Sequence, residues 1–181
     1  DVIKYFNKNN IEVILATNAF DISHFVDFIK DNISTNTGVF ISLDGINEVH
    51  DEFRNKKGAF QKTIENIQLL VKKGIRVRIS SIVWKKNVKQ IEDMVKLAKS
   101  LGAYQIHFTA PIKVGRAGEN DIEADEDYSN LVHIIEAVAE KYTTELFQVS
   151  LKRNRLLDEK SKDCKAGIKI LHISSDGLIS P

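Results

Sequence analysis

Short apolar segments rich in β-branched residues alternate with amphipathic segments along this chain, and this alternation constrains the fold more than any other feature. Apolar residues recur at helical spacing in four stretches, near residues 21–32, 60–71, 88–101 and 125–142. Four strand-like runs accompany them, near residues 11–17, 39–43, 76–83 and 104–109. Buried strands separated by helices are typical of parallel sheets built from right-handed βαβ units. The sequence therefore predicts an α/β fold, a partial TIM-like (β/α) barrel with parallel strands.

The last part of the chain follows a different pattern. The run from Phe147 to Leu151 suits a further strand, and residues 169–173 and 178–179 flank the pair Asp176-Gly177. Because Asp-Gly favours a tight hairpin turn, we predict a short C-terminal β-hairpin region. The chain would then divide into residues 1–145, which belong to the barrel, and residues 146–181, which follow it.

Charge and cysteine content narrow the classes of function. Lys plus Arg total 26 against 25 acidic residues, so the net charge of +1 gives no support for a nucleic-acid or membrane surface. The apolar runs are too short to cross a bilayer, and no secretory signal pattern is present. One cysteine excludes an internal disulfide framework. Together these features favour a cytoplasmic protein.

Polar residues at the carboxyl ends of the predicted strands are the candidates for chemistry, because ligands of parallel α/β folds bind there. Ser42 and Asp44 lie two residues apart, so their side chains leave the same face and suit ribose hydroxyls or an amino-acid head group. Thr17 and Asn18 end the preceding strand, and Asn87 follows the next one. The alternative is that Asp44-Gly45 and Asn18 only form turns.

Arginines beyond these strand ends are further candidates. Arg54 could hold a ligand carboxylate with its two-pronged guanidinium, or it could be a solvated arginine near Lys56 and Lys57. Pro111 and Gly115-Arg116 follow the strand near 104–109, where Gly115 would permit close backbone approach to a phosphate or carboxylate. The five histidines show no metal-ligand spacing, and the lone thiol of Cys164 cannot hold a metal by itself.

The order and spacing of these motifs resemble the radical S-adenosylmethionine (radical SAM) superfamily, in the branch that carries a SPASM or twitch extension. The resemblance covers residues 11–181. Its barrel motifs are Thr17-Asn18, Ser42-Leu43-Asp44-Gly45, His50-Asp51 with Arg54, Val83 with Asn87, and Pro111 with Gly115-Arg116-Ala117. Ala19 stands where the family has glycine after Thr-Asn. The run from Cys164-Lys165-Ala166-Gly167 to Ser180-Pro181 resembles the entry to a SPASM segment.

The resemblance implies S-adenosylmethionine (SAM) and a 4Fe–4S cluster as cofactors. The SAM site would include Thr17, Asn18, Ser42 and Asp44, and Arg54 would contact the methionine carboxylate of SAM. The site would also be lined by Val83, Asn87 and Pro111, which lie at or just beyond the ends of the next two strands. Cys164 would be a ligand of an auxiliary 4Fe–4S cluster. The three-cysteine loop of the main cluster is missing from this chain, so we expect its ligands upstream of Asp1. The parent enzyme would form a 5′-deoxyadenosyl radical and act on a small molecule or peptide, and this chain alone would be inactive.

Two other classes of function stay open on the sequence alone. One is a non-radical βα-barrel enzyme, such as an aldolase-like or phosphate-binding one, in which Arg116 would matter. The other is a non-catalytic binding module. A partial barrel exposes a sheet edge, which predicts either self-association of the chain or disorder of flanking residues.

Overall fold

The computed structural model describes residues 2–33, 38–110, 128–152, 172–173 and 179–180. Five strands form one sheet in the order β1-β2-β3-β4-β5, and every neighbouring pair is parallel. The strands are β1 (Leu15–Thr17), β2 (Val39–Ser42), β3 (Val77–Ile82), β4 (Gln105–Thr109) and β5 (Gln148–Lys152). The predicted parallel α/β architecture is confirmed, with the first strand shorter than the run near 11–17 indicates.

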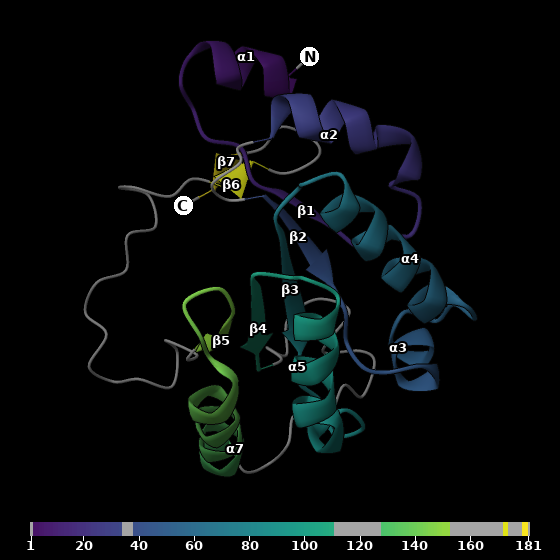
Figure 1. Ribbon diagram of the computed structural model, residues 1–181, viewed down its shortest axis with the longest axis vertical. Coiled ribbons are helices and arrows are strands. Elements are labelled where there is room, and N and C mark those ends of the chain that lie inside the picture. The colour runs from purple at the N-terminus through teal and green to yellow at the C-terminus, as the bar shows by residue number, and fades with distance from the viewer. Residues whose placement is uncertain (1, 34–37, 111–127, 153–171, 174–178, 181) are drawn as a thin grey trace.

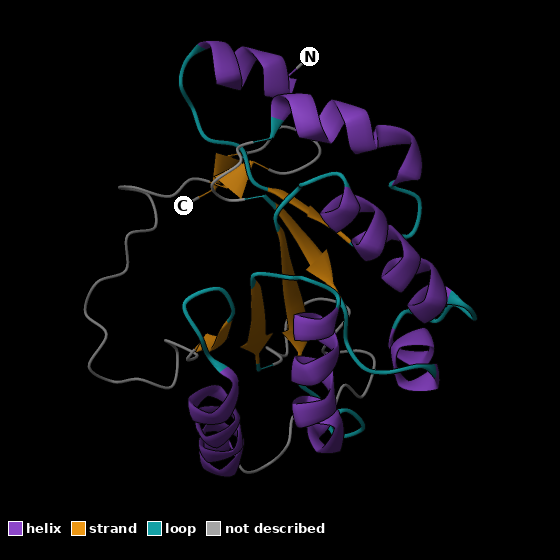
Figure 2. Ribbon diagram, in the orientation of Figure 1, coloured by secondary structure: helices purple, strands orange, loops and turns teal. Residues whose placement is uncertain are grey.

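Among the helices, the first precedes β1 and packs beside α2, whereas the others follow strands and lie along one side of the sheet (Figures 1 and 2). They are α1 (Val2–Lys8), α2 (Val26–Asn32), α3 (Glu48–Phe53), α4 (Ala59–Lys72), α5 (Ile91–Ser100) and α7 (Tyr128–Tyr142), with 3-10 turns η1 (Ser23–Phe25) and η2 (Val88–Gln90). Within the described ranges, none of these helices has the length and apolar content needed to cross a membrane. The strands of the predicted C-terminal hairpin are present as β6 (His172–Ile173) paired antiparallel with β7 (Ile179–Ser180), and the turn predicted at Asp176-Gly177 lies outside the described residues.

The hydrophobic core lies between the sheet and the helices. Alternate strand residues, such as Ile41, Ile79 and Phe108, are fully buried there against Leu70 of α4 and Met94 of α5. The remaining strand residues point to the opposite face, because successive side chains of a strand alternate in direction. The sheet therefore has a helix-covered apolar face and a second face whose side chains are mostly polar.

Candidate functional site

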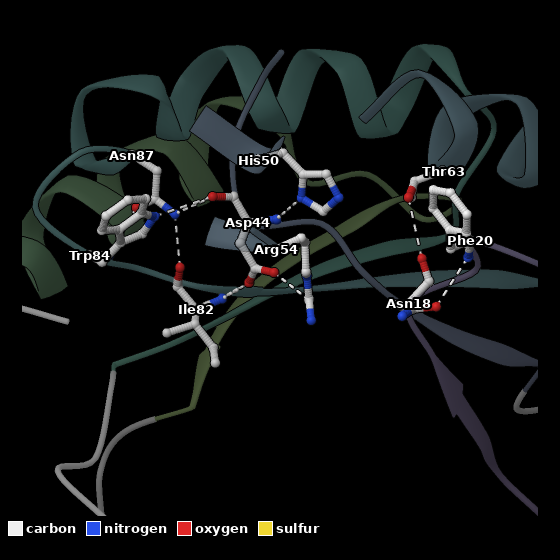
Figure 3. Close-up of polar contacts among 9 residues, drawn as sticks. All are labelled: Asn18, Phe20, Asp44, His50, Arg54, Thr63, Ile82, Trp84 and Asn87. Carbon is white, nitrogen blue, oxygen red and sulfur yellow. Dashed lines mark hydrogen bonds and ion pairs between the residues drawn. The ribbon is translucent and has the colours of Figure 1, made fainter. Parts of the chain in front are cut away.

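The loop after β2 is organised around Asp44, whose side chain is 1% exposed. Its carboxylate pairs with the guanidinium of Arg54 and accepts the backbone N–H of Ile82 at 2.8 Å. Its own backbone N–H donates to Nδ1 of His50 at 3.0 Å. Asp44 thus joins the ends of β2 and β3 to helix α3 and the residue that follows it (Figure 3).

Asn87 connects the same loop to the segment after β3. Its side-chain amide donates to the carbonyls of Asp44, at 3.0 Å, and Ile82, at 2.8 Å, while its Oδ1 accepts the backbone N–H of Trp84 at 2.8 Å. The indole of Trp84 also donates to the Asp44 carbonyl, at 3.3 Å. Asn87 is fully buried, and its amide forms hydrogen bonds to protein groups. These bonds hold the two strand-end loops in place relative to one another.

A tight turn follows β1. Oγ1 of Thr17 accepts the N–H of Ala19 at 3.0 Å, and Oδ1 of Asn18 accepts the N–H of Phe20 at 3.1 Å. Ala19 has a φ of 55°, a left-handed conformation that favours glycine, which gives a physical reason for the glycine in the resembling motif. Asn66 of α4 supports the turn by donating to the Ala19 carbonyl at 2.6 Å.

The other predicted strand residues fall on different faces of the sheet. Ser42 is half-buried, and the register places it beside Ser80 on the face opposite the helices. Thr17 pairs in register with Ile41 of the core, and the Val83 side chain is itself part of the core at 1% exposure. Pro111 and Cys164 lie outside the described residues, as does Arg116.

Burial governs the electrostatics of this region. It raises the pKa of the Asp44 carboxyl, against the opposing effects of Arg54 and the Ile82 N–H. Burial, followed by the charge of Arg54, lowers the pKa of His50 to about 4. A neutral His50 with Nδ1 accepting from Asp44 carries its proton on Nε2. His50 is therefore a fixed hydrogen-bond acceptor of the loop at neutral pH and not a general base.

A pocket of about 130 Å³ opens beside these groups, between the turn after β1 and helices α3 and α4. Among the residues that line it are Asn18, Phe20, His50, Arg54, Lys56 and Thr63. The ammonium of Lys56 lies 3.6 Å from the centre of the Phe20 ring. Nε of Arg54 is shielded from solvent yet has no hydrogen-bond partner in the described part of the chain. Two cations and an unused donor suit a carboxylate or another anion.

Sequence reasoning located the loops but missed several of their supporting residues. Lys56 entered only as a neighbour of Arg54 in the sequence, and Thr63 and Asn66 had no role in the prediction. Polar residues such as Thr63 and Asn66 on the apolar side of a helix were the available signal, since buried polar groups are almost always hydrogen-bonded.

A parallel sheet with helices on one side and polar loops at its strand ends is the architecture of a partial (β/α) barrel. The family model of the radical SAM superfamily matches residues 1–98. The chain therefore belongs to the radical SAM superfamily, as the motifs indicate. S-adenosylmethionine and a 4Fe–4S cluster are the cofactors that this membership implies.

Two curated relatives illustrate the range of the family. The chain is 31% identical over 134 residues to the AdoMet-dependent heme synthase of Methanosarcina barkeri (strain Fusaro / DSM 804), covering 74% of this chain and 38% of that protein. It is 32% identical over 146 residues to the antilisterial bacteriocin subtilosin biosynthesis protein AlbA of Bacillus subtilis (strain 168), covering 79% of this chain and 32% of AlbA. The chain spans well under half the length of these curated relatives.

Solved structures share the fold. Streptococcus suis SuiB bound to precursor peptide SuiA matches with a TM-score of 0.68 at 15% identity, over 86% of this chain and 35% of that one. A domain of a pyruvate-formate lyase-activating enzyme from Bacteroides vulgatus ATCC 8482 matches with a TM-score of 0.64 at 14% identity, over 84% of this chain and 88% of that domain.

Proposed function

We propose that this chain is part of a radical SAM enzyme and binds SAM at the strand ends around Asp44 and Arg54. The observation that carries this proposal is the Arg54 guanidinium, which pairs with Asp44 beside a pocket and keeps a buried Nε with no partner among the residues that the structure describes. That arrangement suits the methionine carboxylate of SAM. Asp44 would act through Arg54, and His50 and Asn87 would fix the loop that holds them both.

The two cofactors of the family fit this chain differently. The pocket of about 130 Å³ and the Nε of Arg54 suit the carboxylate end of SAM, and bound SAM would supply a 5′-deoxyadenosyl radical. The chain's own residues do not suit such a cluster, because clusters are held by several thiolates and the chain has one cysteine. In the described ranges no group of three or more His, Cys, Asp or Glu side chains gathers either.

The class of substrate is proposed from the relatives. AlbA is named for biosynthesis of the bacteriocin subtilosin, SkfB of Bacillus subtilis (strain 168) is named for maturation of a sporulation killing factor, and a SuiB structure contains a precursor peptide. Heme synthases are also among the relatives. We therefore propose maturation of a peptide, protein or cofactor. Residues 146–181 would begin a SPASM-like region with Cys164 as a cluster ligand, and a cytoplasmic location stays a prediction.

Isothermal titration of the protein with SAM tests the proposed site. Arg54→Gln removes the guanidinium, and we expect SAM affinity to fall at least about tenfold, the value of one charge-assisted hydrogen bond. Arg54→Lys keeps the charge beside Asp44 but loses the fork, so it should bind SAM with intermediate affinity.

Lys86→Gln is the matched control, because Lys86 pairs with Glu52 on the surface at 53% side-chain exposure. It should bind SAM as the wild type does. Wild-type affinity in a folded Arg54→Gln protein, with folding checked by circular dichroism, would contradict the proposal.

A further inference from the structure

The sheet face opposite the helices carries two rows of side chains that cross β2, β3, β4 and β5. We call it the polar face. The strand register places Ser42, Ser80, His107 and Ser150 in one row, and Phe40, Arg78, Gln105 and Gln148 in the row before it. Seven of these eight side chains are half-buried, and Gln148 on the edge strand β5 is exposed. Parallel sheets usually bury apolar side chains on both faces, so this composition indicates a face that receives a polar ligand.

Arg78 is the one charged side chain among these eight. It is half-buried, and its guanidinium carbon lies 4.4 Å from the centre of the Phe40 ring. Its Nε is shielded from solvent and has no hydrogen-bond partner in the described part of the chain. No acidic side chain forms an ion pair with it there, and neither row contains one. A half-buried guanidinium with an unused donor is costly unless an anion meets it.

We propose that Arg78 binds a carboxylate of the substrate, so that the polar face selects a carboxylate-bearing molecule or an acidic residue of a peptide. This inference rests on the proposed function, since it names the class of substrate for that enzyme. The Phe40 ring lies against the guanidinium, 4.4 Å from its carbon, and so supports the position of the cation. Charge complementarity selects a carboxylate over a neutral amide of the same shape.

Neighbouring polar groups are ordered around this position. Gln105 pairs in register with Arg78, and its amide donates to Oγ of Ser150 at 2.8 Å. Nδ1 of His107 lies 2.8 Å from the same hydroxyl. These contacts fix the side chains of β4 and β5 beside Arg78. The ligand would therefore meet a rigid surface with one cation in it.

The test uses two probes that differ only in the carboxylate, N-acetylglutamate amide and N-acetylglutamine amide. Each is titrated into the protein, and the arginine Nε–H resonances are followed by NMR. We expect the acidic probe to bind at least about tenfold more tightly than the neutral one. Arg78→Gln should abolish this preference, and Arg78→Lys should retain only part of it.

Arg76→Gln is the control, because Arg76 is an exposed arginine next to the same strand and stacks on Tyr104. It should keep the preference of the wild type. Equal binding of both probes by the wild type would overturn the inference, as would an equal loss of preference in Arg76→Gln. If Arg78→Gln does not fold, the inference is still tested by the preference of the wild type for the acidic probe and by its reduction in Arg78→Lys.

SAM titration of the same variants separates this inference from the proposed function. Arg78→Gln should leave SAM affinity within about twofold of the wild type, whereas Arg54→Gln should lower it. A tenfold loss of SAM affinity in Arg78→Gln would assign Arg78 to the cofactor and overturn the inference. Wild-type protein that binds the acidic probe through Arg78 but does not bind SAM would refute the proposed function alone.

Discussion

At the scale of single residues, the site depends on a few buried polar groups with more than one partner each. The sequence indicated that Asp44 matters, but it could not show that Asp44 joins Arg54, Ile82 and His50. Those partners lie up to 38 positions away along the chain, and tertiary packing alone brings them together. A local motif predicts where a loop begins, whereas the use of each donor depends on contacts distant in sequence.

His50 gives the protein a specific dependence on pH. Its folded-state pKa of about 4 lies below the ordinary value of 6.5, so folding favours the neutral imidazole. The stabilising contribution is complete above pH 6.5 and is lost as pH falls towards 4. Chemical denaturation over this range should show a loss of the order of 3 kcal/mol. His50→Gln keeps an acceptor for the Asp44 N–H without a titrating group, so its stability should vary much less over the same range.

The prediction is tested by comparing how the stability of the wild type and of His50→Gln changes with pH. His24 has a side chain 80% exposed, so His24→Gln serves as the control and should retain the pH dependence of the wild type. Identical pH profiles for the wild type and His50→Gln would show that His50 is not the group responsible.

At the scale of elements, periodicity predicted the long helices and the strands correctly. It missed α1 and α3, which have seven and six residues. Isolated helices of this length are marginal, and most of their stability comes from packing. In α1, Ile3 packs against the core and Asn7 donates to the Asn32 carbonyl at 2.7 Å. Such contacts leave little trace in a local pattern.

Gly38 lies directly before β2, and its substitution tests how closely β2 approaches the backbone at the start of β3. It has a φ of 68°, and a Cβ there would lie 2.0 Å from the Arg76 carbonyl oxygen. Gly74 has a similar φ of 76° with nothing within 4 Å of its added Cβ. Gly74→Ala should cost about 1–2 kcal/mol from the backbone conformation alone. Gly38→Ala should cost about 1–3 kcal/mol more, because the backbone of β3 must move.

Urea denaturation of both variants measures this difference. Equal losses of unfolding free energy would mean that the contact between Gly38 and Arg76 does not limit the packing of β2 against β3.

At the scale of the whole molecule, the fold class was predictable and much of the site was not. The βα period indicated the parallel sheet, and the order of weak motifs indicated the family. Finding the polar face required the strand register, and finding the Nε donors of Arg54 and Arg78, which lack partners among the described residues, required the burial of each group. The division at residue 145, the role of Cys164 and self-association of the chain stay predictions.

The central claim is that the strand-end loops around Asp44 and Arg54 form the SAM site. Backbone amide resonances of the isotopically labelled protein, followed by NMR during SAM titration, test it most directly. The account predicts saturable shifts concentrated in residues 17–20, 42–45 and 54–59, with little change in α7. Shifts confined to α7 or the helix-covered face, or an absence of saturable shifts, would contradict it.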